Sequence, residues 1–187
     1  KKSDYFQPEE FEFVKLEQSS KKKFFNYAIG DGKVHNLNIC YAPGMTSFLK
    51  PNYEYLKLFH KFDEWSKILK VIPIQTKKLD EINFDNSLDL IKIDVQGYES
   101  EVIKFGNDKI KNSLVIQTET SPIPLYENGK PFSYVCNQLE NLGFNLHMFS
   151  KIHNRSFKPM IFNNSIYSGL YHLFQLDCVF VKNFKEI

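Results

Sequence analysis

The chain has 187 residues, a length that suits one domain with one core, and its 24 basic and 22 acidic residues leave a net charge of only +2. This balance, with Arg155 as the single arginine, argues against the basic face of a nucleic-acid-binding protein. Three distant cysteines without a CxxC motif favour a reducing, cytoplasmic setting, and no apolar run approaches the roughly 20 residues that span a bilayer.

Apolar periodicity and turn residues predict an α/β chain in which strands and helices alternate. The expected strands are, in chain order, residues 4–7, 24–29, 34–41, 71–74, 90–95, 114–118, 144–149 and 171–181. The expected helices are residues 8–16, 98–105 and 133–142, while residues 52–70 are expected to form an aromatic-rich, largely helical or irregular insert and residues 150–170 a long polar loop. Such an order implies a mostly parallel sheet with helices on both faces.

Two residues fix details of these elements. Pro73 interrupts the strand at 71–74 and therefore places it at the edge of a sheet, because proline cannot donate a backbone hydrogen bond. Ser133 can cap the helix at 133–142, which we expect to bury Val135 and Leu139 and to end at Gly143.

Residues 90–106, LIKIDVQGYESEVIKFG, carry the clearest functional signal. A short run rich in β-branched residues, typical of a strand buried on both faces, ends at Asp94, and Gly97 then permits a sharp turn into a helix. In open α/β sheets, functional groups gather at the carboxyl ends of strands. The next strand ends at Glu119 in the same way, so Asp94 and Glu119 are candidate catalytic residues, with Glu119 as a candidate general base.

Two other interpretations of this stretch are weaker. DVQGYE resembles the DxxG switch of a GTPase, but the chain has no GxxxxGK[ST] loop to hold phosphates. Asp94, Glu99 and Glu101 could suggest a divalent metal site, but residues at i and i+2 of a helix point in different directions, so at most one glutamate joins Asp94. The histidines show no HxxxH or HExxH pattern, and we expect no metal.

Several stretches of the chain resemble, in order, segments of the FkbM-type methyltransferases, which use S-adenosylmethionine (SAM). They are FQPEEFEFVKL (6–16), NYAIGDGKV (26–34), GMTSFLKP (44–51), TKKLDEI (76–82) and LIKIDVQGYESEVIKFG (90–106), the last of which resembles the signature K-I-D-[VI]-[EQ]-G-x-E-x-x-V-L-x-G. The resemblance covers residues 4–125, about two thirds of the chain.

The resemblance implies a Rossmann-like SAM-methyltransferase fold over residues 1–187, with one doubly wound, mostly parallel sheet and an antiparallel last strand. The strands at 144–149 and 171–181 would be its final pair. The family's glycine-rich first strand and loop, which hold the methionine part of SAM, would lie upstream of residue 1, so we expect an N-terminally incomplete domain that lacks its first βα unit. The activity implied is methyl transfer to a hydroxyl of a sugar, glycan or secondary metabolite.

The resemblance also implies which residues form the site. The candidate catalytic residues are Asp94, Glu119 and Glu99, and the candidate cofactor-binding residues are Gln7, Tyr27, Ala28, Asp31, Ser47, Gln96 and Gly97. Gln7 stands where the family usually places a glutamate for the ribose hydroxyls, and an amide loses the stronger charge-assisted bond.

Plainer roles remain open for several of these residues. Tyr27 could pack in the core, Asp31 could only form a turn, Ser47 could be an ordinary loop serine, and Glu99 could be a solvated helix charge. An alternative for the whole chain is a methyltransferase-like module that binds or assembles without catalysis. Gln7 and the missing first strand favour that alternative, whereas the DVQGYE signature favours an enzyme. Unpaired strand edges also allow a homodimer.

Overall fold

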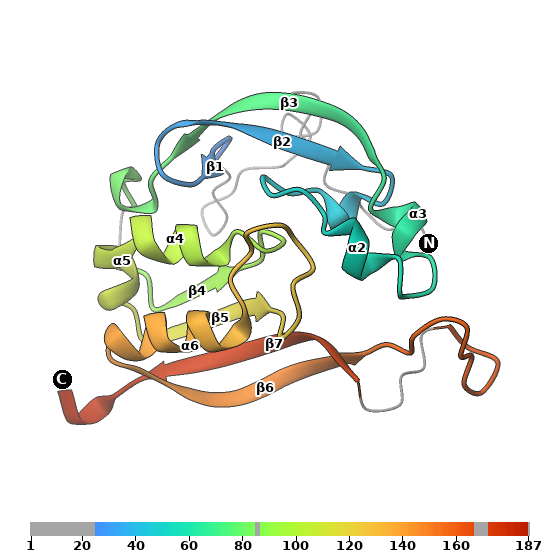
Figure 1. The fold of residues 1–187 in the computed structure, drawn as a ribbon. Helices are drawn as coiled ribbons and strands as arrows, with labels where there is room; N and C mark the ends of the chain where they lie inside the picture. Colours follow the sequence, from blue (N-terminus) through green and yellow to red (C-terminus); the bar gives the residue numbers. More distant parts are fainter. Residues whose placement is uncertain (1–24, 85–86, 167–171, 187) are drawn as a thin grey trace.

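The computed structural model describes residues 25–84, 87–166 and 172–186 (Figure 1). Gln7 and the elements expected at 4–7 and 8–16 lie outside the described residues. The strands are β1 (Ala28–Ile29), β2 (Val34–Cys40), β3 (Ile68–Lys77), β4 (Leu90–Ile93), β5 (Val115–Thr120), β6 (Phe144–Asn154) and β7 (Leu173–Lys182). The helices are α2 (Tyr53–Leu56), α3 (Phe62–Trp65), α4 (Glu99–Phe105), α5 (Asn107–Lys111) and α6 (Phe132–Asn141), with short 3₁₀ turns η1 (Pro43–Met45), η2 (Leu79–Glu81) and η3 (Phe184–Glu186).

The described strands form two mixed sheets. In the four-stranded sheet, with order β4-β5-β7-β6, β4 and β5 are parallel and β7 runs antiparallel to both of its neighbours. This is the antiparallel last strand and the final strand pair that the sequence predicts. In the three-stranded sheet, with order β1-β3-β2, β1 is parallel to β3 and β2 is antiparallel to it. The expected edge position of residues 71–74 is therefore wrong for β3 as a whole. At Pro73 itself, however, β3 pairs with β2 alone among the described strands, because β1 reaches only Thr76 and Lys77.

The expected single, doubly wound and mostly parallel sheet is therefore wrong for the described residues. Three of the five strand pairs are antiparallel, and they are β2–β3, β5–β7 and β6–β7. Parallel neighbours need a crossover that carries the chain back along the sheet, and the segment between β4 and β5 supplies one with α4 and α5. The insert between β2 and β3 instead returns the chain antiparallel to itself, with two short helices at its far end (Figure 1).

Helices α4, α5 and α6 pack on one face of the four-stranded sheet, and β2 and β3 arch above them (Figure 1). The main core joins inward side chains of the helices and of all four strands of this sheet, among them Ile93, Ile103, Ile116, Leu139 and Phe180. The expectation that the strand at 90–95 is buried on both faces is wrong, because Leu90 and Lys92 on its second face are exposed.

Helix α6 follows its sequence pattern closely. It buries Val135 and Leu139 as expected, and Gly143 lies just beyond its end with a φ of 83°. The expected cap is wrong: Pro131 is the N-cap residue, and Ser133 lies inside the first turn. Proline has no backbone N–H that would need a hydrogen-bond partner at this place, and the helix begins two residues earlier than a cap at Ser133 predicts.

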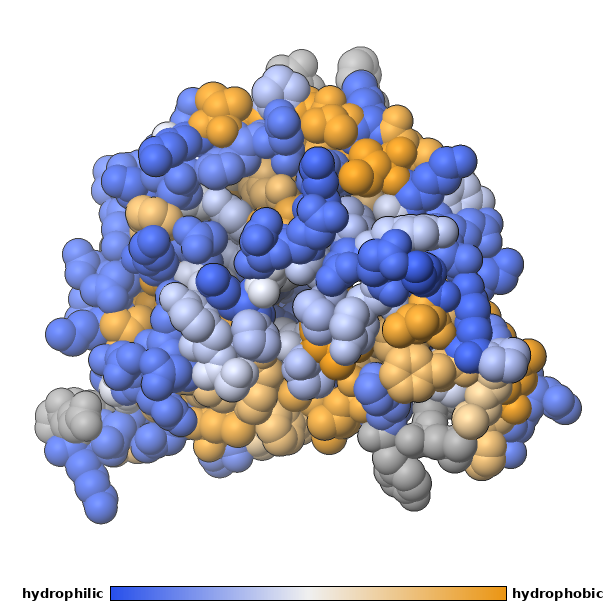
Figure 2. Space-filling model, in the orientation of Figure 1, coloured by the Kyte–Doolittle hydropathy of each residue, from blue (hydrophilic) through white to orange (hydrophobic). Residues whose placement is uncertain are grey.

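Strand β6 is an edge strand whose side chains, apart from Phe144, are largely exposed. The pairing with β7 shifts register between Leu146 and Met148 and again between Phe149 and Lys151, so that His147 and Ser150 are bulged residues. Figure 2 shows apolar side chains gathered along the lower margin of the molecule, where β6 and β7 run.

Among the described residues, every helix is too short or too polar to span a bilayer.

Candidate active site

The loop after β4 places two residues in the left-handed region of backbone conformation. Gln96 has a φ of 53° and Gly97 a φ of 92°. A side chain at Gly97 would not fit, because a Cβ there would lie 2.6 Å from Cδ2 of Tyr126. The loop therefore passes directly beneath the tyrosine ring, and glycine is the residue that both the conformation and the space require.

Glu99, the first residue of α4, fastens this loop. Its Oε1 accepts hydrogen bonds from the backbone N–H groups of Val95, at 3.2 Å, and Gly97, at 3.0 Å. The side chain is buried, and burial raises its pKa to about 7 against the lowering effect of those two hydrogen bonds. Glu99 is thus not a solvated helix charge; it holds the backbone that carries the candidate site residues.

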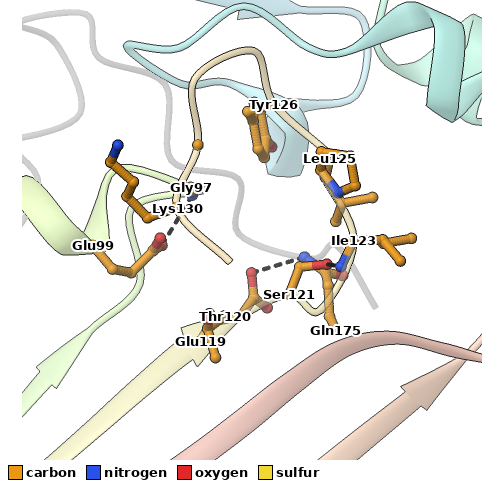
Figure 3. Close-up of a pocket in the computed structure, with 12 residues that line it drawn as sticks. Gly97, Glu99, Glu119, Thr120, Ser121, Ile123, Leu125, Tyr126, Lys130 and Gln175 are labelled. Carbon is orange, nitrogen blue, oxygen red and sulfur yellow. Dashed lines mark hydrogen bonds between the residues drawn. The ribbon is translucent and has the colours of Figure 1, made fainter. Parts of the chain in front are cut away.

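Asp94, Gln96 and Glu119 meet at the carboxyl ends of β4 and β5. The Nε2 group of Gln96 donates to Oδ1 of Asp94, at 3.0 Å, and to Oε1 of Glu119, at 3.1 Å. A second amide, Nε2 of Gln175 on β7, donates to the same Glu119 oxygen at 2.9 Å (Figure 3). Among the described residues, the other Glu119 oxygen, Oε2, accepts no hydrogen bond.

Glu119 has an unusual protonation behaviour for a carboxyl group. Burial is the largest cause that raises its pKa to about 7, and the negative charges of Asp94, Glu99 and Asp177 raise it further, while the hydrogen bond from Gln96 opposes them. Near neutral pH this group therefore exists in both forms. Asp94 is more exposed and pairs with Lys92, whose Nζ lies 3.4 Å from Oδ2.

Gln96 also joins the loop to two more distant segments. The hydroxyl of Ser47 donates to its backbone oxygen at 2.7 Å, and the hydroxyl of Tyr126 donates to its side-chain oxygen at 3.2 Å. Ser47 is buried, so it is more than an ordinary loop serine: it fixes the loop from the side of β2. The structure thus brings Ser47, Gln96, Gly97 and the three carboxyl candidates into one network.

The candidates on the β1 side form a separate group. Oδ1 of Asp31 accepts hydrogen bonds from Lys33 N, at 2.9 Å, and from Nε2 of His35, at 2.7 Å. Burial acts to raise the pKa of Asp31, but these bonds outweigh it and the pKa is lowered. The turn connects to the DVQGY loop through the Tyr98 hydroxyl, which lies 3.5 Å from Nε2 of His35.

Tyr27 and Ala28 lie just before this turn. Tyr27 is 47% exposed, with Nζ of Lys77 4.3 Å from its ring centroid, so core packing does not describe it. Ala28 is half-buried in β1. The structure does not bring these two residues into hydrogen-bond contact with the carboxylate network.

A small cavity of about 30 Å³ lies between the end of β5 and residues 121–130, with Glu99, Glu119, Tyr126 and Gln175 in its wall (Figure 3). This volume is enough for about one water molecule. In Figure 3 the carboxyl groups of Glu99 and Glu119 both point toward this space. A cofactor of the size of SAM cannot enter the cavity itself and would have to bind along the open side of the strand ends.

The sequence analysis missed Gln175, Tyr126 and His35. Gln175 was detectable in principle, because it and Asp177 are polar residues at alternate positions of an otherwise apolar strand. Tyr126 and His35 carried no such signal: Tyr126 lies in an irregular segment, and the bond of His35 to Asp31 closes a turn that local periodicity does not describe.

Comparison with known proteins identifies the family. The family model described as the Methyltransferase FkbM domain matches residues 3–146, more than three quarters of the chain. A 2-O-methyltransferase, NoeI, from Sinorhizobium fredii (strain NBRC 101917 / NGR234) is 34% identical over 79 residues, which are 41% of this chain and 32% of NoeI. The match thus spans about a third of the length of that relative, and no solved structure matches the chain significantly. The extent of the family match shows that this chain belongs to the FkbM methyltransferase family.

Proposed function

We propose that this protein is a SAM-dependent O-methyltransferase that acts on a hydroxyl of a sugar, glycan or secondary metabolite. Family membership supports methyl transfer, and the similarity to a protein named as a 2-O-methyltransferase supports oxygen as the acceptor atom. The observation that carries the proposal is Glu119: a carboxyl group at a strand end, with a pKa of about 7 and one oxygen free of hydrogen bonds among the described residues.

The residues at the strand ends fit a cationic cofactor. Bound SAM would supply an electrophilic methyl group on a positively charged sulfur, and the negative charges of Asp94 and Glu119 favour such a cation nearby. We place the adenine beside Tyr27, Ala28 and Asp31, whose Oδ2 accepts no hydrogen bond from the described residues. Ser47, Gln96 and Gly97 would shape the wall of the site, and Gln7 would contact the ribose.

The reaction requires little covalent work from the protein. The acceptor oxygen forms a bond to the methyl carbon while the carbon–sulfur bond breaks and its electron pair stays on sulfur. The hydroxyl proton goes to Oε2 of Glu119, which can accept it near neutral pH and release it to water. Asp94 orients the hydroxyl, so that positioning supplies most of the remaining acceleration.

Binding and turnover test the proposal separately. We expect S-adenosylhomocysteine (SAH) to bind with micromolar affinity in a calorimetric titration, and labelled SAM to transfer its methyl group to members of a panel of sugars and glycans. Glu119→Gln should lower turnover by about 10²–10⁴-fold and leave SAH affinity within a few-fold, because it removes the base but not the pocket. Glu127→Gln, at an exposed glutamate in the segment 121–130 that follows β5, is the matched control and should behave as the wild type.

Each failure has a distinct meaning. Full turnover by Glu119→Gln would overturn the general-base assignment, and full turnover by Asp94→Asn would overturn the orienting role of that residue. Binding of SAH without transfer to any acceptor would favour a binding module that no longer catalyses. Absence of SAH binding would contradict the cofactor proposal itself.

The setting that we propose is the cytoplasm. Cys40, Cys136 and Cys178 are all free, and burial raises the pKa of each thiol to about 11 or 12, so none is an activated thiolate. Unpaired, unreactive cysteines are typical of proteins in reducing compartments.

A further inference from the structure

Gln175 occupies a position that neither the signature motif nor the family match covers, since the match ends at residue 146. It lies on β7 and crosses toward the end of β5, where its Nε2 group reaches Oε1 of Glu119 at 2.9 Å. Gln96 reaches the same oxygen at 3.1 Å from the opposite side, from the loop after β4. Two neutral amides from different elements therefore hold one oxygen of Glu119 between them.

Because both amides donate to the same oxygen, the two oxygens of Glu119 have different surroundings. Rotation of the carboxyl group would break two hydrogen bonds at once, so Oε1 stays between the amides and Oε2 stays free of them. A carboxyl group held in this way offers a single, fixed oxygen to an incoming hydroxyl, which is the geometry that efficient proton transfer requires.

The charged groups around Glu119 explain why its carboxylate needs these two hydrogen bonds. Asp94, Glu99 and Asp177 face Glu119 from the β4 loop, from α4 and from β7, and all three disfavour its charged form. Lys130 lines the cavity from the segment 121–130, and Nε2 of His153 lies 3.7 Å from Oδ2 of Asp177. The amide donors are the groups that hydrogen-bond the carboxylate directly, and they favour its charged form against burial.

We infer that Gln175 is a positioning residue: its amide holds Oε1 of Glu119 and so leaves Oε2 oriented to accept the acceptor's proton. This inference rests on the proposed role of Glu119 as general base. It adds that the last strand of the sheet, outside the family signature, sets the orientation and the protonation of that base.

Direct titration of Glu119 by carbon NMR of labelled glutamate side chains tests the inference without a known acceptor. Glu119→Gln identifies the resonance. In the wild type we expect a pKa of about 7. Gln175→Leu removes a donor to the carboxylate and should raise the pKa to about 8 or above, whereas Gln175→Lys supplies a positive charge and should lower it to about 6 or below. Once an acceptor is known, the apparent pKa in the pH profile of turnover should likewise rise in Gln175→Leu and fall in Gln175→Lys.

Gln117→Leu is the matched control, because Gln117 lies two residues before Glu119 on the same strand and makes no hydrogen bond to it. The control should leave the Glu119 pKa at its wild-type value. Equal Glu119 pKa values in Gln175→Leu, Gln175→Lys and the wild type would overturn the inference. If Gln175 had a merely structural role, the two variants would change the unfolding temperature but would not shift the Glu119 pKa in opposite directions. SAH binding, measured on the same samples, tests the proposed function separately. If the wild type shows the expected pKa changes but does not bind SAH, the proposed function and the role of Oε2 in it are rejected, and only the hydrogen bond by which Gln175 holds Glu119 is kept.

Discussion

Two adjacent residues of the site, Gln96 and Gly97, are the most restricted in backbone conformation and in the space around them. Gly97 has no freedom to carry a side chain, because its φ of 92° and the Tyr126 ring exclude one. Gln96 adopts a left-handed conformation that is unusual for a residue with a Cβ, and hydrogen bonds from Ser47 and Tyr126 hold it there. Residues in such conformations persist where their surroundings determine them strongly, as at sites of ligand binding and catalysis.

Gly97→Ala tests this account of the loop. We expect the free energy of unfolding to fall by about 2–4 kcal/mol, because the alanine adds a strained conformation to a 2.6 Å contact with Tyr126. Urea denaturation measures the change. Gly44→Ala is the control, since a Cβ at Gly44 meets no atom within 4 Å and its φ is not in the left-handed region. Equal losses from the two substitutions would contradict the account.

At the scale of residues, the sequence was sufficient to predict that the two carboxylates lie close together, but not to predict which side chains hydrogen-bond to them. Asp94 follows β4 and Glu119 lies at the end of β5, and parallel strands place their carboxyl ends at one edge of a sheet, so their proximity was predictable. The contact of Gln175 with Glu119 depends on the register of the antiparallel pair β5–β7, which pairs Glu119 with Asp177. No local pattern specifies a register between strands more than fifty residues apart.

At the scale of elements, β6 shows where periodicity misleads. The sequence predicts a strand at 144–149 followed by a polar loop, but β6 continues to Asn154. Leu146, Phe149 and Ile152 pair with the inward residues of β7, and the bulges at His147 and Ser150 space them three residues apart instead of two. The alternation that marks a strand is thereby lost, although the strand is not.

The turn between β1 and β2 depends on β3 rather than on its own glycines alone. Thr76 of β3 is buried, and its hydroxyl accepts a hydrogen bond from Gly32 N, at 3.1 Å, and donates one to Lys33 O, at 2.7 Å. One side chain thus satisfies both backbone groups of the turn that carries Asp31. The three-stranded sheet contributes to the site by holding this turn in place.

Thr76→Val should therefore lower the free energy of unfolding by about 1–3 kcal/mol, because it leaves Gly32 N without its partner and removes one of the two hydrogen bonds that Lys33 O accepts, the other being from Thr76 N. Thr120→Val is the matched control: Thr120 is also buried, but its hydroxyl has no hydrogen-bond partner among the residues that the structure describes, so the same change should be neutral or stabilising. Thermal unfolding of both variants at one pH decides the matter. A loss at Thr120 as large as that at Thr76 would show that burial of the hydroxyl, not its bonds, controls stability.

At the scale of the whole molecule, two buried carboxyl groups couple stability to pH. Glu99 and Glu119 each have a pKa of about 7 in the fold, above the ordinary value of 4.5. Between these values the folded protein binds more protons than the unfolded chain, so stability falls as pH rises from about 4.5 to 7 and is then constant with respect to these groups. Each group costs up to about 3 kcal/mol above pH 7.

We expect the free energy of unfolding to be higher at pH 5 than at pH 8, with a smaller difference in Glu119→Gln, which should be more stable than the wild type at pH 8. Urea denaturation across this range measures both. His153, whose pKa is lowered chiefly by burial, acts in the opposite direction below pH 6.5, but it is common to both proteins and cancels in their difference. Identical pH dependence in the variant and the wild type would show that Glu119 ionises as freely in the fold as in water.

The irregular edge of the four-stranded sheet affects how neighbouring molecules meet. A straight edge strand offers an unbroken row of N–H and C=O groups on which a second sheet can grow. The extra residues His147 and Ser150 interrupt that row and increase the local twist, so an approaching strand finds no long stretch in register. Apolar side chains such as Met148 and Ile152 can therefore stay in contact with water without making β6 a template for fibril-like assembly.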